Sequence, residues 1–331
     1  MKKIIVFNVR EEEVDLTKEW AKDHNVEVKL VKEQLSLENV VLAKGFDGIS
    51  TSQNSPVPND IYPIIKEYGI HQIAQRSAGV DYYDLEEAKE QGVIISNVPS
   101  YSPESIAEFA LMSALTLVRK SRLIEEKVQG HDFRWQPSIR AGVINEMTVG
   151  VIGTGSIGLT SAKLFKGLGA KIVAFDVFES EAAKEIVTYK NSIEEVVEMS
   201  DIVTLHIPAT KDNFHQFNLE MFKKFKPSAY FINAARGSVV DTEELIEALD
   251  TGLLAGAALD TYENEANFIP KNFEGKELND SLLERVLSHE KIIFTPHIAH
   301  YTDVSVRRIM QISLNSVLDI LTTGDTELRV N

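Results

Sequence analysis

Short apolar runs, rich in valine and isoleucine, alternate along the chain with longer amphipathic segments. This alternation is typical of βαβ units, in which parallel strands form a sheet and helices cover it. The runs fall into two series of strand-like segments. The first series is 3–8, 26–31, 47–50, 72–75 and 93–97, and the second is 148–152, 171–176, 201–206, 229–234, 255–260 and 291–295. The pattern predicts an α/β fold of two Rossmann-like or flavodoxin-like lobes with parallel sheets and a cleft between them.

Two long helices are predicted outside the strand series. Ser102 and Pro103 mark the start of the first, with serine as the N-cap and proline in the first turn. We expect this helix to continue to about Gly130. The second should follow Thr302 and end near Thr323.

The length of 331 residues is enough for about two domains. Six strands complete a dinucleotide-binding sheet, so the first series and the last helix must form the other lobe. We therefore expect one domain at 101–299 and a discontinuous second domain at 1–100 plus 300–331.

Composition narrows the classes of function. Hydrophobic residues make up 44% and charged residues 25%, as in ordinary globular proteins. The net charge of −16 disfavours binding to nucleic acid or to an anionic membrane surface. The absence of cysteine excludes disulfides, thiolate metal sites and cysteine nucleophiles. We expect a cytoplasmic protein that has no metal site and does not bind nucleic acid or a membrane.

A glycine-rich turn follows the first run of the second series. Gly153, Gly155 and Gly158 form a G-x-G-x-x-G pattern after a strand and at the start of a helix. They permit a tight turn, an approach of the backbone to a pyrophosphate and close packing of helix and strand, respectively. Asp176 ends the next run, 18 residues after Gly158, near the spacing of a ribose-binding carboxylate. Because residues 177–179 contain no basic side chain for a 2′-phosphate, the sequence predicts NAD rather than NADP.

Polar side chains also follow the later runs of the second series. In open α/β sheets, ligands bind at the carboxyl ends of the strands, so these residues are candidates for a site. Each alone could be an ordinary loop residue, but their succession beside a dinucleotide turn indicates a function. The strand ends are Asp176, His206-Ile207-Pro208, Asn233-Ala234-Ala235-Arg236-Gly237, Asp260 with Glu263 and Glu265 beyond it, and Pro296-His297.

The chemistry of hydride transfer suggests roles for these side chains. A histidine can move a proton near neutral pH, and a neighbouring carboxylate favours its charged form. Arginine can bind a substrate carboxylate through two parallel hydrogen bonds. Among the eight histidines, only His206 and His297 lie at strand ends. Of the others, His131 lies in an aromatic segment, His300 follows the last strand, and four lie in polar contexts where we expect exposure: His24, His71, His215 and His289.

Several stretches resemble the D-specific 2-hydroxyacid dehydrogenases, over essentially the whole chain. They are Asn233-Ala-Ala-Arg-Gly-Ser-Val-Val-Asp241, Asp260-Thr-Tyr-Glu-Asn-Glu265 and Thr295-Pro-His-Ile-Ala299. Two further stretches, Asn97-Val-Pro-Ser-Tyr-Ser-Pro103 and His131-Asp-Phe-Arg-Trp135, are similar to the branch of D-lactate and D-2-hydroxyisocaproate dehydrogenases.

This resemblance implies NAD-dependent reduction of a 2-oxoacid, with pyruvate and NADH giving D-lactate and NAD. It implies His297 as the acid/base, Glu265 as its partner, and Arg236 as the group that binds the carboxylate and polarises the carbonyl. It also implies a substrate-binding role for the 1–100 plus 300–331 domain and a homodimer built through the 101–299 domain. Tyr101 and the backbone of Ala78 and Gly79 would bind substrate. With the glycines and strand-end residues above, the cofactor residues would be Gly153, Gly155, Ser156, Ile157, Gly158, Asp176, His206, Ile207, Pro208, Asn213, Ala234, Ala235, Arg236 and Asp260.

The identity of the substrate side chain stays open. Ser52 and His300 stand where D-lactate dehydrogenases of this branch often carry larger, commonly aromatic residues, so both are candidate substrate-binding positions. A D-2-hydroxyisocaproate-type preference for larger 2-oxoacids is the alternative. Two other classes are weighed: an NAD-binding corepressor-like protein, for which no peptide-binding signature is found, and S-adenosylhomocysteine hydrolysis, which needs a longer substrate domain.

Overall fold

The computed structural model describes residues 1–331, and the chain divides into two compact units. The first unit comprises Met1–Ser102 and Tyr301–Asn331, and the second comprises Pro103–His300. Each unit has its own sheet, of five strands in the first and seven in the second. All neighbouring strands are parallel. The predicted α/β class with parallel sheets is confirmed, and no helix is both long and apolar enough to span a membrane.

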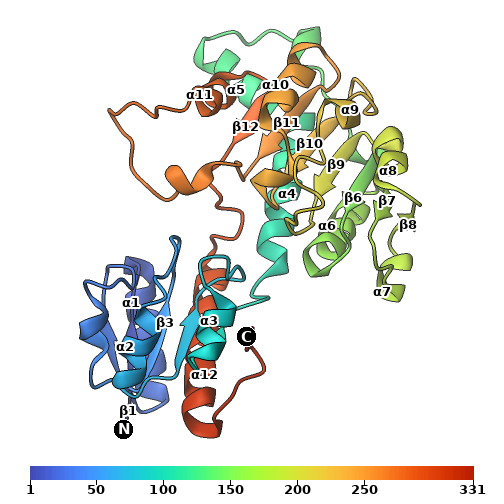
Figure 1. The fold of residues 1–331 in the computed structure, drawn as a ribbon. Coiled ribbons are helices and arrows are strands. Elements are labelled where there is room, and N and C mark those ends of the chain that lie inside the picture. The colour runs from blue at the N-terminus through green and yellow to red at the C-terminus, as the bar shows by residue number, and fades with distance from the viewer. The chain divides into compact units, whose positions relative to one another are not determined.

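The first unit has the strand order β2-β1-β3-β4-β5, the flavodoxin-like order. Side chains of β1 alternate between faces: Ile4 packs in a cluster with Leu314 of the last helix, α12, whereas Ile5 packs with Ile65 of α2. In Figure 1, α12 (red) accordingly lies beside the blue strands. The elements are β1 (Lys2–Val6), α1 (Glu11–Asp23), β2 (Val26–Leu30), a 3-10 turn (Val40–Ala43), β3 (Gly48–Thr51), α2 (Ile61–Glu67), β4 (Gln72–Gln75), α3 (Leu85–Glu90), β5 (Ile94–Ser96) and α12 (Asp303–Thr323).

The second unit has the strand order β12-β11-β10-β9-β6-β7-β8. The chain proceeds from β6 outward to one side and then from β9 outward to the other, as in Rossmann folds, so its topological switch point lies between β6 and β9. The elements are α4 (Pro103–Val118), α5 (Ser121–Gln129), β6 (Thr148–Ile152), α6 (Ser156–Gly167), β7 (Lys171–Phe175), α7 (Glu181–Lys184), β8 (Thr188–Tyr189), α8 (Ile193–Met199), β9 (Ile202–Leu205), α9 (Leu219–Phe222), β10 (Tyr230–Asn233), α10 (Thr242–Asp250), β11 (Gly256–Leu259), α11 (Ser281–Ser288) and β12 (Ile292–Phe294), with 3-10 turns at Pro137–Ile139, Ile144–Glu146, Gly237–Val239 and Glu265–Asn267.

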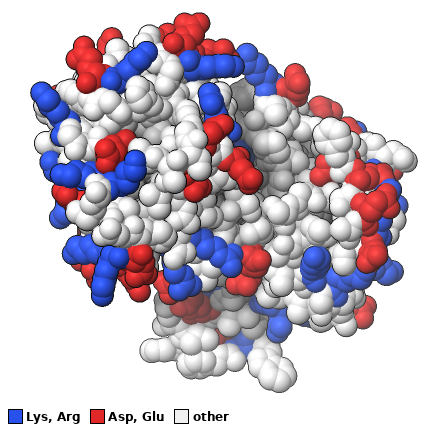
Figure 2. All heavy atoms as spheres, turned by 90° about the horizontal axis from the view of Figure 1, so that it is seen from below, with Lys and Arg blue, Asp and Glu red and all other residues white.

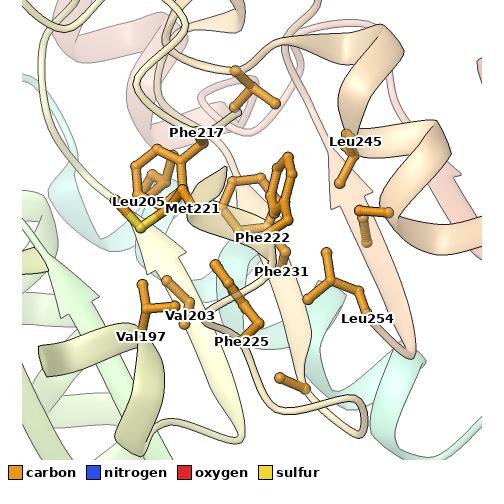
Figure 3. Close-up of a cluster of buried hydrophobic side chains, with 14 of the residues drawn as sticks. Val197, Val203, Leu205, Phe217, Met221, Phe222, Phe225, Phe231, Leu245 and Leu254 are labelled. Carbon is orange, nitrogen blue, oxygen red and sulfur yellow. The ribbon is translucent and has the colours of Figure 1, made fainter. Parts of the chain in front are cut away.

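A cluster of phenylalanines fills the core on one face of the second sheet (Figure 3). Phe231 of β10 lies with its ring centroid 5.3 Å from Phe217 and 5.6 Å from Phe222. All three side chains are fully buried. On the opposite face, Ala110 of α4 and Phe165 of α6 belong to a second buried cluster. The sheet that carries the polar strand ends is therefore held on both faces.

Two details of the predicted elements are wrong. The helix expected from Ser102 to about Gly130 is interrupted, because Lys120 adopts the left-handed conformation (φ 53°) between α4 and α5. The second sheet has a seventh strand, β8, whose two residues pair with Val173 and Ala174 of β7 and are too few to form a recognisable apolar run. The last helix is confirmed, with Thr302 as its N-cap.

Candidate functional site

The glycine turn in the second unit is shaped by backbone contacts. Gly153 has φ +89°, and a Cβ atom there would lie 2.5 Å from the carbonyl oxygen of His206. At Gly158 a Cβ atom would lie 1.9 Å from the carbonyl oxygen of Gly153. At Gly155, the N-cap of α6, nothing lies within 4 Å of that position. The start of α6, at Ser156 and Ile157, therefore has open space beside the helix N-terminus, where an anionic phosphate is favourable.

Asp176 follows β7 directly, beside this turn. Its Oδ2 atom accepts hydrogen bonds from the backbone N and Oγ1 of Thr154, at 2.5 and 3.1 Å. Its Oδ1 atom accepts one from the backbone N of Phe178 at 3.0 Å. The carboxylate is thus fixed next to the glycine turn while remaining partly exposed. Together, the turn, the open helix start and this carboxylate fit the pyrophosphate and ribose of NAD.

The two strand-end histidines differ in their surroundings. Burial lowers the pKa of His206 to about 4, so its imidazole is neutral near pH 7. Its Nε2 atom lies 3.1 Å from Oγ1 of Thr204, and it has no carboxylate partner. His297 instead has one, Glu265, described below. Of the two candidates left open by the sequence, only His297 has the surroundings that a proton donor requires.

The loop after His206 borders a hollow. The side chain of Asn213 closes this loop, because it donates to the carbonyl of Pro208 at 2.8 Å and accepts from the backbone N of Thr210 at 2.7 Å. Ile207 lies against the glycine turn, as its Cγ2 atom would be 2.8 Å from a Cβ atom at Gly153. The hollow has a volume of about 570 Å³ and is lined by Ala209, Thr210, Lys211 and Phe214.

Arg236 follows β10 in a turn that is braced by Asn233. The Asn233 side chain donates to the carbonyl of Arg236 at 2.9 Å and accepts from the backbone N of Ala235 at 3.0 Å. The guanidinium is exposed and donates to the carbonyl of Ala235 at 2.8 Å. It forms no ion pair with any carboxylate of residues 1–331, so its charge is available to an anionic ligand.

Glu265 and His297 form a pair at the neighbouring strand ends. The Oε1 atom of Glu265 lies 2.7 Å from Nδ1 of His297, and its Oε2 atom accepts from the backbone N of Tyr262 at 3.1 Å. The side chains are 25% and 34% exposed, so the pair can be reached by a ligand. The ring of His300 lies edge-on to His297, with centroids 5.9 Å apart.

Asp260 anchors the loop that carries His297. Its buried carboxylate, 3% exposed, accepts hydrogen bonds from Thr295 Oγ1 at 2.6 Å, Ile298 N at 3.0 Å and Ala299 N at 2.8 Å. Its carbonyl accepts from the backbone N of His297 at 2.7 Å. This anchoring contact was not foreseen from the sequence, which gave Asp260 only a cofactor role.

His215 is a second feature that sequence reasoning missed. The expectation of an exposed side chain is wrong, because its ring lies between Asp241 and Glu263 and is 26% exposed. The expectation is also wrong for His289, whose side chain is 11% exposed and pairs with Asp250. The polarity of the neighbouring sequence did not predict the burial of the His215 side chain, because both of its carboxylate partners are distant in sequence.

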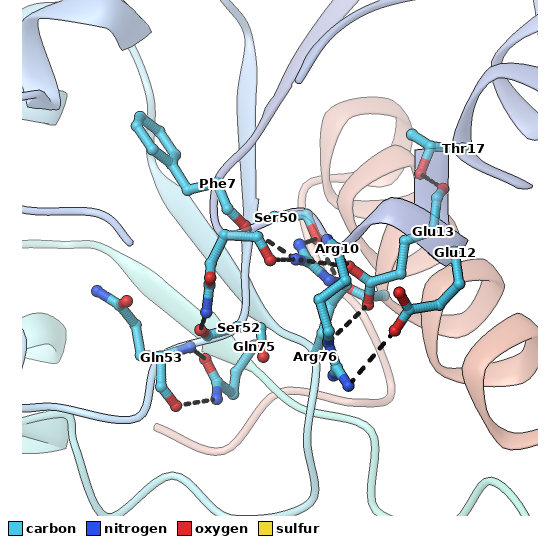
Figure 4. Close-up of polar contacts among 12 residues, drawn as sticks. Phe7, Arg10, Glu12, Glu13, Thr17, Ser50, Ser52, Gln53, Gln75 and Arg76 are labelled. Carbon is cyan, nitrogen blue, oxygen red and sulfur yellow. Dashed lines mark hydrogen bonds and ion pairs between the residues drawn. The ribbon is translucent and has the colours of Figure 1, made fainter. Parts of the chain in front are cut away.

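In the first unit, Ser52 lies at the switch point of the sheet, just after β3. Its carbonyl accepts a hydrogen bond from Asn8, which follows β1, at 2.5 Å. The buried guanidinium of Arg76 in turn donates to the carbonyl of Asn8 at 2.7 Å and lies 3.5 Å from the carboxylate of Glu13 (Figure 4). Burial lowers the pKa of Arg76, and the Glu13 charge opposes that shift. Ser52 is thus held by a polar network fixed inside the sheet.

Ala78 and Gly79 present their backbone N–H groups. The carbonyl of Ala78 accepts from Asn97 Nδ2 at 2.7 Å, and that of Gly79 accepts from Ser77 Oγ at 2.8 Å. Their N–H groups make no hydrogen bond within residues 1–331. Both N–H groups therefore keep their capacity to donate to solvent or to a ligand. The carbonyl of Tyr101 accepts from Arg308 at 2.9 Å, which fixes the end of this unit's first segment.

Comparison with known proteins agrees with this geometry. Residues 111–299 match the family model of the D-isomer specific 2-hydroxyacid dehydrogenase, NAD binding domain. The chain is 50% identical over 329 residues to a D-lactate dehydrogenase of Streptococcus pyogenes serotype M1, covering 99% of this chain and 100% of the relative.

Two solved structures are also similar over nearly the whole length. A D-lactate dehydrogenase from Treponema pallidum has 39% identity and a TM-score of 0.93, and the match covers 99% of both chains. A D-2-hydroxyisocaproate dehydrogenase has 36% identity and a TM-score of 0.94, again over 99% of both chains. The chain therefore belongs to the D-isomer specific 2-hydroxyacid dehydrogenase family. It is an NAD-dependent oxidoreductase that acts on D-2-hydroxyacids.

Proposed function

We propose that this protein is a D-lactate dehydrogenase that reduces pyruvate with NADH, and that Arg236, Glu265 and His297 are its catalytic residues. The observation that carries the assignment is the 2.7 Å contact between Glu265 and His297, together with an exposed arginine that follows the neighbouring strand β10 and that no carboxylate neutralises. A proton donor and an unpaired cation are what the reduction of a 2-oxoacid demands of the protein.

The steps performed by the chain follow from these contacts. The glycine turn and Asp176 would hold NADH, which when bound would supply the hydride for the carbonyl carbon of pyruvate. Glu265 accepts a hydrogen bond from Nδ1–H of His297 and so orients the ring, and the Nε2–H group of the protonated imidazole donates its proton to the carbonyl oxygen. Arg236 binds the substrate carboxylate and polarises the same carbonyl. In the reverse direction neutral His297 takes the proton from the hydroxyl of D-lactate.

For the cofactor, we propose that the second unit is the NAD-binding domain. The backbone at Gly155, Ser156 and Ile157 would bind the pyrophosphate, and Asp176 the adenosine ribose. The remaining proposed cofactor contacts are Gly153, Gly158, His206, Ile207, Pro208, Asn213, Ala234, Ala235, Arg236 and Asp260. Asp260 would contribute mainly by placing the 295–299 loop, since both its oxygens already accept hydrogen bonds.

For the substrate, we propose that the first unit is the substrate-binding domain. The unsatisfied N–H groups of Ala78 and Gly79 suit a carboxylate, and Tyr101 and Ser52 would contact the rest of the molecule. His300 of the second unit would lie near the substrate side chain. Because Ser52 is small, a preference for larger 2-oxoacids is the second candidate, and the likeness to a D-2-hydroxyisocaproate dehydrogenase also favours it.

We further propose a homodimer in the cytoplasm. Helix α5 buries none of its residues, and apolar side chains are exposed beside it: Phe133 is 70% and Trp135 is 98% exposed. A second copy of the chain covering this surface would remove them from water. Sedimentation velocity of wild type and Trp135→Ser tests this, since the variant should dissociate at concentrations where wild type is dimeric.

The central experiment is a steady-state assay of NADH oxidation with pyruvate, 2-oxobutyrate, 2-oxoisocaproate and phenylpyruvate, with chiral analysis of the product. We expect the highest kcat/KM for pyruvate and a product of D configuration. Activity confined to the larger acids would replace the proposed substrate by the second candidate. No turnover with any of them, despite NADH binding, would favour a corepressor-like function.

A further inference from the structure

His215 lies between two carboxylates in the second unit. Its Nδ1 atom is 3.1 Å from Oδ2 of Asp241, and its Nε2 atom is 3.0 Å from Oε2 of Glu263. An ionised carboxylate only accepts hydrogen bonds, so His215 donates from Nε2 to Glu263. The Nδ1 atom lies within ion-pair distance of Asp241, so the same ring contacts both carboxylates.

The same two carboxylates cap helix α10. Asp241 accepts from the backbone N of Glu244 at 3.0 Å, and Glu263 accepts from the backbone N of Thr242 at 3.2 Å. Each acid therefore uses one oxygen for the helix and the other for His215. Two negative charges at a helix N-terminus are partly compensated by its dipole, and His215 donates a hydrogen bond to one of them. The cluster is 17–26% exposed, so solvent screens it less than an ordinary surface ion pair.

The backbone around His215 ties the cluster to the turn after Arg236. His215 donates its backbone N–H to the carbonyl of Ser238 at 2.9 Å. Its φ of +49° is uncommon for a residue other than glycine, and its ring stacks on Phe214 with centroids 3.9 Å apart. Gly237 packs so closely that a Cβ atom there would lie 2.4 Å from the backbone N of Glu263.

Three segments of the candidate site therefore meet at one side chain. They are the loop that contains Asn213, the turn that carries Arg236, and the segment that leads from Glu263 to Glu265. We propose that His215 is a positioning residue: its ring holds Glu263, and with it the backbone that carries Glu265, against the Arg236 turn. The expected effect on catalysis rests on the proposed function. The contacts by which His215 holds the three segments together, called the clamp below, lie within the second unit and do not depend on that function.

The kinetic test uses His215→Phe, which retains a flat ring for stacking on Phe214 and removes the two ring nitrogens that contact Asp241 and Glu263. We expect kcat for pyruvate reduction to fall by at least about fivefold, because a displaced catalytic group loses its reactive geometry. The KM for NADH should change less than kcat, since the glycine turn and Asp176 are untouched and only Asn213 among the proposed cofactor contacts lies in the altered loop. In a Glu263→Gln background the same substitution should cost much less, because the contact that it removes has already been weakened.

The chain offers a matched control at the other end of the same helix. His289 pairs with Asp250, the last residue of α10, at 3.3 Å. His289→Phe removes a partly buried histidine–carboxylate pair that belongs to none of the three segments, and its kcat should match wild type. A fall of less than fivefold in His215→Phe, or an equal fall in His289→Phe, would overturn the proposal.

Hydrogen–deuterium exchange tests the clamp without activity. Peptides covering 213–217 and 262–266 should exchange faster in His215→Phe than in wild type. Their exchange rates in His289→Phe should equal those of wild type. Unaltered exchange in His215→Phe would overturn the clamp whatever the kinetics. If wild type reduces none of the 2-oxoacids, the proposed function fails, and the exchange measurement alone decides on His215.

Discussion

Replacing Asp260 by asparagine removes a charge from beneath the histidine loop with almost no change of shape. The carboxylate is buried and accepts from Thr295, Ile298 and Ala299. An asparagine has one oxygen and one NH₂ group, so in either orientation at least one backbone N–H of the loop faces another donor. The variant Asp260→Asn should therefore lose one hydrogen bond outright and weaken the others.

The magnitude follows from these contacts. A hydrogen bond to a charged group contributes about 1.5–3 kcal/mol, and a buried donor left without an acceptor costs a similar amount. We expect the free energy of unfolding to fall by about 2–4 kcal/mol. Since the backbone N of His297 is bonded to the same residue, the loop should shift and kcat should fall by about 10- to 100-fold.

Urea unfolding and steady-state kinetics measure the two effects. Asp201→Asn is the matched control, because Asp201 lies at the amino end of β9 and accepts from Thr148 N at 2.9 Å and Lys226 Nζ at 2.8 Å. It should lose stability while its kcat stays within about twofold of wild type. If Asp260→Asn retains wild-type kcat, the carboxylate does not place His297.

Three further substitutions and one pH effect have equally definite outcomes. Glu265→Gln should lower kcat for pyruvate reduction and leave the KM for NADH within about threefold, because His297 loses the carboxylate that orients its ring; an unchanged kcat would remove Glu265 from its role. Asp176→Ala should weaken NADH binding and relax the bias against NADPH, and equal use of both cofactors by wild type would contradict this. Ser52→Tyr should lower kcat/KM for phenylpyruvate more than for pyruvate, since a methylene in an apolar pocket typically contributes about 1–3 kcal/mol to discrimination; an unchanged ranking would show that Ser52 does not limit size. Burial lowers the pKa of His206 to about 4, so as the pH is lowered from the ordinary histidine value to about 4 the unfolded chain takes up a proton that the folded chain does not. The free energy of unfolding, measured by urea unfolding, should therefore decrease as the pH is lowered through that range, and it should decrease less in His206→Gln.

The fold was largely predictable because its signals are local. Each buried parallel strand appears as a short apolar run, and the turn at Gly153 has its own pattern of glycines. The features of the fold that were missed have no distinctive pattern in the local sequence. Strand β8 has only two residues. The break between α4 and α5 is a single left-handed residue, Lys120, with no neighbouring glycine or proline to predict it.

The candidate site divides in the same way. Arg236, Glu265 and His297 were candidates because each lies just after or near the end of a strand, and the resemblance to D-specific 2-hydroxyacid dehydrogenases implied their roles. The partners of His215 could not, because Asp241 and Glu263 come from different loops and are brought together at the start of α10. A histidine in a polar segment carries no sign of what will lie on either side of its ring.

The distribution of charge explains how a chain of net charge −16 can bind anionic ligands. On the face drawn in Figure 2, basic and acidic side chains are interspersed. Three acidic residues of the chain lie in the segment 260–265, and each has a hydrogen-bond donor. Loop amides donate to Asp260, His215 to Glu263 and His297 to Glu265. These carboxylates are therefore committed to holding the site together, whereas the guanidinium of Arg236 has only a backbone carbonyl as partner. These pairings determine the sign of the electrostatic field at a bound substrate carboxylate. The net charge of the chain does not predict that sign.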